Sequence, residues 1–310
     1  MIRDRLIQAG VPVTVIPSRG PIPFPSRDWR DMKGFLLVAV RQRGPLQSCR
    51  PSADYQLPLV SGCPGLCEYC YLHTRFGQRS YTTVYANVEE ILSWTMDYRT
   101  KETVVFEGSA TSDPVPVNEW TSSLEEAITF FARQEGMRFR FATKFHEVDL
   151  LLPLDHGQQT EIRFSVNTPA IIRQYERGTP SLAKRLAAAR RIREAGYPSG
   201  FLIAPILAYP AWKEDYRRLV NTIAETVTSQ GDNITFELIS HRYTARAKEM
   251  ILSLNPESTL PMVDEERQFK YGQFGYGKYV YPQTLREALK GFLTEAIQEA
   301  MPKAKILYFV

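Results

Sequence analysis

Cysteine is scarce in this sequence of 310 residues, which holds only four. So few cysteines exclude the disulfide-rich scaffolds of small secreted domains. The sequence also lacks any apolar run near the ~20 residues that a membrane-spanning helix needs, and residues 1–8 contain no apolar signal core. These absences predict a protein of a reducing compartment, placed in the cytoplasm, with no membrane partner.

A large excess of charge is absent as well. Lysine and arginine total 38 against 34 aspartate and glutamate, which leaves a net charge of +4. This mildly basic balance is compatible with a polyanionic partner but does not demand one. The length allows either one large α/β domain or two smaller ones, and it suffices to bury a substantial core.

Three of the four cysteines lie within eight positions, in the segment Cys63-Pro64-Gly65-Leu66-Cys67-Glu68-Tyr69-Cys70. Their C-x3-C-x2-C spacing directly follows an apolar run at 55–60 that predicts a buried strand. Three thiolates on one loop suit an iron–sulfur cluster, and with three ligands one iron of a [4Fe–4S] cluster stays open to a small molecule. A zinc site is the alternative, because His73 would complete a Cys3His set. A third reading is three buried cysteines that bind nothing. The crowding of all the ligands on one loop favours the cluster.

Strand-like apolar runs alternate with helical patterns from residue 55 onward. The runs lie at 55–62, 103–108, 138–143, 161–166, 200–207 and 233–239, and helices are predicted at 87–99, 119–135, 181–195 and 212–229. Six strands with intervening helices predict a parallel α/β sheet. Sites in such folds lie at the carboxyl ends of the strands.

The two ends of the chain differ from this middle. Five prolines between residues 12 and 25 predict an irregular N-terminal leader at 1–50. After residue 240 a short helix precedes a hairpin at 269–281 that is rich in glycine and aromatic residues. A final helix at 283–300 and a strand at 304–310 follow. We therefore expect a leader at 1–50, a barrel at 51–242 and a C-terminal region at 243–310, folded as a single compact unit.

The cysteine spacing, with an aromatic residue before the third cysteine and a strand before the first, resembles the radical S-adenosylmethionine (SAM) superfamily. In that superfamily the open iron binds the amino and carboxylate groups of SAM, and an electron from the reduced cluster cleaves SAM to a 5′-deoxyadenosyl radical. The resemblance implies a [4Fe–4S] cluster on Cys63, Cys67 and Cys70, SAM as second cofactor and an external one-electron reductant. The protein would orient the reactants and exclude water.

Longer segments resemble the spore photoproduct lyase family, from about residue 30 to the end. They are 51–59, 69–74, 106–113, 163–167, 195–198, 234–239, 275–279 and 308–309. The resemblance implies a partial (β/α)6 TIM-type barrel and a radical SAM carbon–carbon lyase. Such enzymes repair 5-thyminyl-5,6-dihydrothymine in DNA to two thymines: a hydrogen is removed at C6, the methylene bridge breaks, and the product radical takes a hydrogen back.

The resemblance also implies roles for individual residues. The expected SAM contacts are Tyr69, Ser112, Lys144, Ser165 and Asn167. A lysine ammonium at a strand end suits the carboxylate of SAM, whereas a polar pair such as Ser165 and Asn167 is also typical of a turn. Tyr69 and Tyr71 match family tyrosines of a radical relay, although both would equally pack against the cysteine loop.

Three positions depart from the family pattern. Ala110 stands where many family members carry the cysteine that returns hydrogen to the product radical. In the hairpin, Gln273 and Phe274 replace an arginine and a tyrosine of a Gly-Arg-Tyr-Gly pattern. Tyr71, Tyr69 and Cys49 are the alternative catalytic donors, with Tyr71 favoured and Cys49 also readable as an inert loop or core residue.

The hairpin is the expected DNA-facing segment. Its substrate-facing residues are Lys270, Tyr271, Gln273, Phe274, Tyr276, Lys278 and Tyr279. Lysines would contact phosphates and aromatic rings would stack or wedge between bases, although the segment also reads as a packed hairpin that covers the barrel mouth.

Three functions remain open at this point. The first is repair of the thymine lesion. The second is the same radical chemistry on a different nucleotide, base or RNA substrate. The third is a non-catalytic, metal-containing protein that binds damaged DNA.

Overall fold

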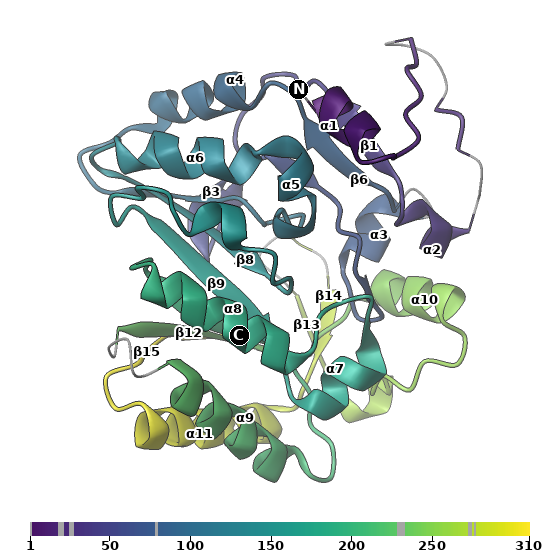
Figure 1. Ribbon diagram of the computed structural model, residues 1–310. Helices are drawn as coiled ribbons and strands as arrows, with labels where there is room; N and C mark the ends of the chain where they lie inside the picture. The colour runs from purple at the N-terminus through teal and green to yellow at the C-terminus, as the bar shows by residue number, and fades with distance from the viewer. Residues whose placement is uncertain are drawn as a thin grey trace.

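The computed structural model describes residues 2–17, 22–24, 28–77, 80–227, 233–271, 275 and 277–310. Its centre is an eight-stranded sheet in the order β15-β12-β11-β9-β8-β7-β3-β2. Six strands form the middle of this sheet: β3 (Ala53–Gln56), β7 (Val104–Glu107), β8 (Met137–Thr143), β9 (Thr160–Val166), β11 (Ser199–Ile206) and β12 (Ile234–Ser240). Each pairs in parallel with its neighbours, and the sheet curls into a half barrel (Figure 1). The predicted partial (β/α)6 barrel is confirmed.

One further strand extends the sheet at each edge. β15 (Lys305–Phe309) pairs in parallel with β12, and β2 (Ser48–Cys49) pairs antiparallel with β3. Since β2 belongs to the segment that the sequence predicts as an irregular leader, the leader contributes an edge strand. It also contains α1 (Ile2–Gln8), α2 (Trp29–Met32) and β1 (Leu36–Ala39).

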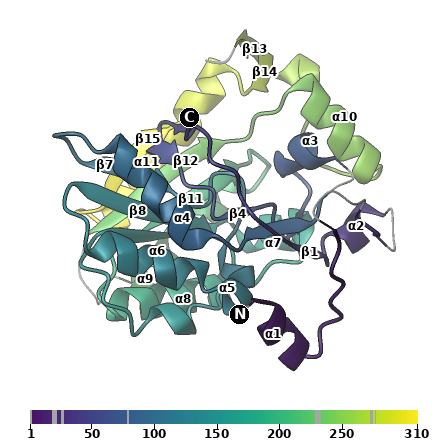
Figure 2. The same ribbon diagram turned by 90° about the horizontal axis from the view of Figure 1, so that it is seen from above.

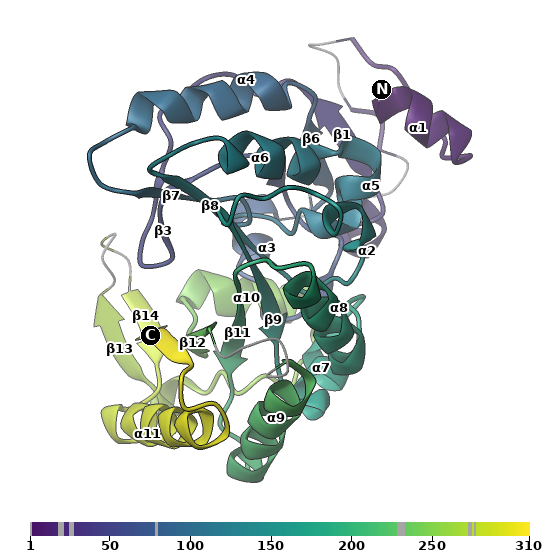
Figure 3. The same cartoon turned by 60° about the vertical axis from the view of Figure 1, so that its left-hand side comes forward.

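Helices cover the outer side of the curled sheet (Figure 3). They are α4 (Val88–Ser93), α5 (Asn118–Thr121), α6 (Ser123–Ala132), α8 (Leu182–Glu194), α9 (Trp212–Val227) and α11 (Gln283–Ala300). The apolar stripe of α9 shows why they pack there, because Leu219, Ile223 and Val227 recur at helical spacing and are buried. At about 25 cal/mol per Å² of apolar surface, such burial is the main stabilising contribution.

Two predicted helices are interrupted. The helix expected at 119–135 is divided between α5 and α6, because Ser122 has a φ of 53° in the left-handed region, where a helix cannot continue. The helix expected at 87–99 is α4 followed by a 3-10 helix, η1 (Trp94–Tyr98).

The strand expected at 55–62 is also divided. Its first part belongs to β3, and its second part, β4 (Val60–Ser61), joins a separate sheet in the order β1-β6-β4 with β6 (Thr82–Tyr85). Pro58 lies between the two parts and has no backbone N–H to donate to a ladder. The break turns the chain away from the barrel just before the cysteine loop.

The remaining elements surround the barrel mouth. The loop contains β5 (Leu66–Cys67), which pairs with β10 (Glu176–Arg177), and α3 (Leu72–Phe76) follows it and lies beside α10 (Ala245–Leu254) (Figure 2). α7 (Pro169–Tyr175) precedes β10. β13 (Gln268–Tyr271) and β14 (Gly277–Val280) form the predicted hairpin. Short 3-10 helices are η2 (Val115–Val117), η3 (Asp149–Leu151) and η5 (Asp264–Glu266).

Across the described ranges, none of the helices combines the length and the apolar character that crossing a membrane would require.

Candidate functional site

The cysteine loop is fixed at the carboxyl edge of the barrel by two backbone connections. The Gly62 amide donates to the Thr111 carbonyl at 3.0 Å, which ties the start of the loop to the segment after β7. In the pairing of β5 with β10, Cys67 lies opposite Glu176. The loop is therefore held between the ends of β7 and of α7, where parallel barrels carry their sites.

The three thiols of the loop face a common region. Burial raises the pKa of Cys63 to about 12 and the pKa of Cys67 well above its ordinary value, and the nearby Cys70 thiol adds to both shifts. Gly65 keeps the space between two of them clear, since a Cβ there would lie 3.4 Å from Cys63 Sγ and 4.0 Å from Cys67 Sγ. Because thiols with raised pKa values are neutral at pH 7, an electropositive metal centre is what would ionise them.

This arrangement fits a cluster better than a zinc ion. Within the described ranges, no three His, Cys, Asp or Glu side chains converge as ligands of one metal ion. The zinc alternative required His73, whose Nε2 lies 3.0 Å from the Cys67 carbonyl oxygen and whose ring packs edge-on against Trp29, while its buried Nδ1 has no hydrogen-bond partner among the described residues. In an iron–sulfur cluster each cysteine binds a different iron, so the thiols need not meet at one point.

A buried cation supports the same conclusion. Lys33, just after α2, is 6% exposed and donates from Nζ to the Cys63 carbonyl at 2.7 Å. It forms no ion pair with any residue that the structure describes. Burying an ammonium group without a counter-charge is costly. A cluster held by three thiolates carries net negative charge and would offset that cost, so the residues present fit a [4Fe–4S] group.

Three of the predicted SAM contacts lie together beside this loop. Lys144 follows β8, and its Nζ is 2.8 Å from Ser165 Oγ at the end of β9. The same ammonium lies 5.6 Å from the ring centroid of Tyr69. Because β8 and β9 are parallel neighbours, their carboxyl ends bring Lys144 and Ser165 together.

Glu176 links these residues and was missed by sequence reasoning. Its Oε1 lies 3.0 Å from Lys144 Nζ, its Oε2 lies 2.6 Å from Arg185 Nη2, and it accepts a hydrogen bond from the Tyr69 hydroxyl. Burial alone would raise the pKa of Glu176, but Lys144 and Arg185 outweigh burial and hold the pKa below its ordinary value. Two cations around one carboxylate leave a positive charge that suits a second carboxylate. The sequence carries no motif at this position that would have found it.

The other predicted SAM contacts lie nearby in different settings. Ser112 forms an isolated parallel bridge with Gly62, which places it beside the start of the cysteine loop. Asn167 is fully buried, and its Nδ2 donates to the Pro205 carbonyl at 2.7 Å while its Oδ1 accepts from the Thr168 amide. Its amide therefore joins two strand ends, and its contact with SAM stays a prediction.

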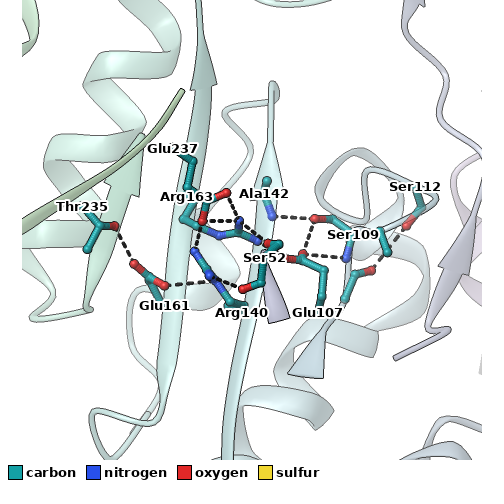
Figure 4. A network of polar contacts seen from close by, with 12 residues as sticks. Ser52, Glu107, Ser109, Ser112, Arg140, Ala142, Glu161, Arg163, Thr235 and Glu237 are labelled. Carbon is teal, nitrogen blue, oxygen red and sulfur yellow. Dashed lines mark hydrogen bonds and ion pairs between the residues drawn. The ribbon is translucent and has the colours of Figure 1, made fainter. Parts of the chain in front are cut away.

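A buried ion network fills the barrel behind the site (Figure 4). Arg163 of β9 pairs with Glu107 of β7 and with Glu237 of β12, and Arg140 of β8 pairs with Glu237 and with Glu161. Glu107 also accepts from both the amide and the hydroxyl of Ser109. The network ties four strands together and fixes the start of the loop that contains Ala110.

The hairpin presents some of the predicted residues to solvent. Lys270 and Tyr271 are exposed, Tyr271 at 80%, while Lys278 and Tyr279 are half-buried. Tyr279 stacks on Tyr243 with ring centroids 5.3 Å apart, which anchors β14 to the segment after β12. Gln273, Phe274 and Tyr276 lie outside the described residues.

A family model described as "Spore photoproduct lyase" matches residues 19–310. The chain belongs to the spore photoproduct lyase family. The spore photoproduct lyase of Clostridium acetobutylicum is 44% identical over 282 residues, covering 90% of this chain and 83% of that protein. The Bacillus subtilis lyase is 40% identical over 287 residues, covering 91% and 84%.

Solved spore photoproduct lyases share the fold. A cysteine-to-alanine variant with dinucleoside spore photoproduct has a TM-score of 0.95 and 36% identity, over 100% of this chain and 94% of that one. A double variant with bound AdoMet and the same dinucleoside has a TM-score of 0.92, 36% identity and the same coverage. The prediction of a radical SAM lyase of this family is confirmed, and the non-catalytic binder is set aside.

Within this spore photoproduct lyase fold, the favoured hydrogen donor, Tyr71, lies beside Ala110. The Tyr71 hydroxyl donates to the Ala110 carbonyl, although the residue as a whole is 56% exposed. Desolvation of the hydroxyl and the nearby thiols of Cys70 and Cys49 raise the pKa of Tyr71. Burial and the charge of Glu107 raise the pKa of Cys49 to about 12, so this thiol keeps its hydrogen at neutral pH. The thiol of Cys49, at the end of the edge strand β2, is thus near enough to act on the charge of the Tyr71 hydroxyl.

Proposed function

We propose that this chain repairs 5-thyminyl-5,6-dihydrothymine in DNA to two thymines as a radical SAM lyase. The observation that carries the proposal is family membership over residues 19–310, together with Lys144, Ser165 and Tyr69 gathered on Glu176 beside the cysteine loop. Related lyases are solved with the dinucleoside lesion, and one of them with AdoMet as well.

In this proposal, residues around the cysteine loop bind the two cofactors, the [4Fe–4S] cluster and SAM. Cys63, Cys67 and Cys70 bind a [4Fe–4S] cluster, and Lys144 binds the carboxylate of SAM with its ammonium oriented by Glu176 and Ser165. When bound, these two groups supply a radical that abstracts hydrogen. Buried Lys33 compensates the negative charge of the cysteine loop, and the ring of Tyr69, within that loop, lies under the Lys144 ammonium.

The substrate end would return the hydrogen through Cys49 and Tyr71. The Cys49 S–H bond breaks as a C–H bond forms on the product radical, and the thiyl then takes a hydrogen atom from the Tyr71 hydroxyl. An electron from the external reductant and a proton from water restore the tyrosine. The nearness of Cys49, Tyr71 and Ala110 supports this route, because the family's usual cysteine is absent at Ala110.

The partners follow from this chemistry. The substrate is DNA that carries the thymine lesion, and a one-electron carrier must deliver the electron. The cytoplasm, a reducing compartment, is the location that suits a cluster held by free thiolates.

Anaerobic reconstitution tests the proposal. The chain is loaded with iron and sulfide, which should give about four irons per chain, and supplied with SAM, a reductant and the lesion as a dinucleotide. We expect 5′-deoxyadenosine and a dinucleotide in which both thymines are restored, while an undamaged thymidine dinucleotide is recovered unchanged. Formation of 5′-deoxyadenosine without recovery of thymine would reject lyase activity.

SAM binding is tested separately by equilibrium dialysis. Lys144→Ala removes a charge-assisted hydrogen bond and should weaken SAM affinity about tenfold to hundredfold. Lys184→Ala, on the exposed face of α8, is the matched control and should bind SAM as the unmodified chain does. Equal affinity in all three would remove Lys144 from the SAM site.

Ala110 favours a second candidate function. It is the one departure from the family pattern that lies among the described residues. The same radical chemistry on another nucleotide, base or RNA substrate would not need the family's cysteine. This alternative predicts slow lesion repair with by-products, and faster turnover on the other substrate in the same anaerobic assay.

A further inference from the structure

A cationic cavity opens beside the proposed hydrogen-return site and has no assigned role. It has a volume of about 80 Å³, several times the space that one water needs. Its polar walls include Arg41, Gln47, Gln56, Arg75 and Thr111, and none of its lining residues is acidic. Two arginines in a cavity with no acidic lining residue give it a positive charge that suits an anion.

Neither arginine is neutralised by the part of the chain that the structure describes. Arg41 lies over the ring of Tyr85 at 5.5 Å and contacts its hydroxyl at 3.4 Å, and Arg75 lies over the ring of Phe76 at 5.7 Å. No described carboxylate forms an ion pair with either guanidinium. Arg43, two residues from Arg41, differs in that it is paired with Asp97 and does not line the cavity.

The cavity lies close to the reacting end of the barrel. Thr111 lines it and directly follows Ala110, whose carbonyl accepts from Tyr71. Tyr71 is the N-cap of α3, and Arg75 lies one turn further along the same helix. A nucleotide whose base reaches Tyr71 and Cys49 would therefore have its backbone near these arginines.

We propose that this cavity binds a phosphodiester group of the substrate strand, held by Arg41 and Arg75. The proposal rests on the proposed function and adds to it a phosphate subsite at the barrel edge formed by β2 and β3. Guanidinium groups match phosphate oxygens in charge and in bidentate geometry. The glutamine side chains and Thr111 supply neutral donors in the same cavity.

Two measurements test the subsite. The first is the salt dependence of binding to undamaged oligothymidylate, which requires no lesion chemistry. Each phosphate contact on a single strand contributes about −0.7 to the slope of log K against log salt, so loss of this one phosphate contact in the double variant Arg41→Gln with Arg75→Gln should reduce the steepness by about 0.7. Arg43→Gln is the matched control and should leave the slope unchanged.

The second measurement compares affinities for the lesion as a dinucleotide, which has a phosphodiester, and as a dinucleoside, which has none. The double variant should lose about tenfold or more in affinity for the dinucleotide and nothing for the dinucleoside. Arg75→Gln alone should show part of the effect, and circular dichroism should show an unchanged fold. Unchanged dinucleotide affinity and salt slope in both variants would overturn the subsite. Failure of the unmodified chain to repair either compound would instead overturn the proposed function.

Discussion

At the scale of single residues, the proposed route of hydrogen return begins at Cys49. This residue lies outside the cysteine loop, on an edge strand that belongs to a segment expected to be irregular. Its thiol stays protonated because burial and Glu107 raise its pKa to about 12, and a thiol that keeps its hydrogen is what a donor requires. Tyr71, next to it, has its hydroxyl directed at Ala110.

Replacement of Cys49 by alanine should separate radical formation from hydrogen return. We expect 5′-deoxyadenosine to form at the normal rate, thymine yield to fall about tenfold or more, and by-products of the unquenched radical to appear in mass spectrometry. In heavy water the unmodified chain should place deuterium in thymine, because a thiol exchanges with solvent. Ser48→Ala, one position away on β2, is the control, and an unchanged product distribution in Cys49→Ala would show another donor.

Lys33 supports a second prediction at this scale. Its buried ammonium lies at the Cys63 carbonyl, and reduction would add negative charge to the proposed cluster, which its three thiolates would already make anionic. Lys33→Met should therefore make the midpoint potential of the reconstituted cluster more negative, as measured by titration followed by electron paramagnetic resonance. Lys33→Arg should preserve the potential, and Arg30→Gln, on the exposed side of α2, should not affect it. A Met variant with normal iron content and an unshifted potential would contradict the role.

At the scale of elements, only one strand of the hairpin β13–β14 is bonded to the rest of the fold, and the other strand faces solvent. β14 exchanges backbone hydrogen bonds with the segment after β12 through Tyr279 and Tyr243, whereas every residue of β13 is exposed. Such an element adds little to the core but offers cations and rings to a nucleic acid.

Lys270→Gln combined with Tyr271→Ala should therefore weaken DNA binding without loss of stability. We expect lower affinity for lesion-containing DNA, unchanged turnover of the dinucleoside, and a free energy of unfolding within about 0.5 kcal/mol of the unmodified value. Fluorescence anisotropy and urea unfolding measure the two. Lys290→Gln on the exposed face of α11 controls for loss of one charge. Equal DNA affinity in the two variants would exclude the hairpin from the interface.

His241, at the carboxyl end of β12, should make the stability of the folded chain depend on pH. It is 3% exposed, its Nδ1 lies 3.2 Å from Arg267 Nη2, and burial together with Arg267 lowers its pKa to about 3. The unfolded chain binds a proton near pH 6.5 and the folded chain does not, so stability is full above pH 6.5 and falls toward pH 3.

Between pH 7 and pH 5 this single group should reduce the free energy of unfolding by about 2 kcal/mol. In His241→Gln that part of the pH dependence should disappear, while His146→Gln, at a less buried histidine, should retain it. Urea unfolding at both pH values measures the difference. Parallel pH profiles for the unmodified chain and His241→Gln would refute the assignment.

At the scale of the whole molecule, one ion network holds the half barrel together. Arg163 pairs with carboxylates from strands on both sides of it, Glu107 of β7 and Glu237 of β12. The strands of a half barrel do not close on themselves, so side chains that cross the interior connect its two halves. The same network fixes Ser109, and through it the loop of Ala110.

Arg163→Met should destabilise the fold by about 3–5 kcal/mol, because it leaves Glu107 and Glu237 buried without their central cation. Urea unfolding at pH 7 checks this, with Arg218→Gln on the exposed face of α9 as a control expected within about 0.5 kcal/mol. A loss below about 1 kcal/mol in Arg163→Met would mean that Arg140 alone holds the network.

The sequence by itself determined the order of strands and helices, the cysteine loop and the residues that end the strands. Those features are local, because a strand's period and a motif's spacing are written in neighbouring positions. Lys144 and Ser165 could be placed together, since they end adjacent parallel strands.

Only the tertiary structure decided which distant side chains meet. Tyr69 and Glu176 are 107 residues apart, Tyr71 and Ala110 are 39 apart, and Lys33 and Cys63 are 30 apart. Hydrophobic periodicity does not predict such pairs, because they depend on the curvature of the sheet and on the break in the chain at Pro58. That curvature gave Lys144 its carboxylate partner and brought a thiol beside Tyr71.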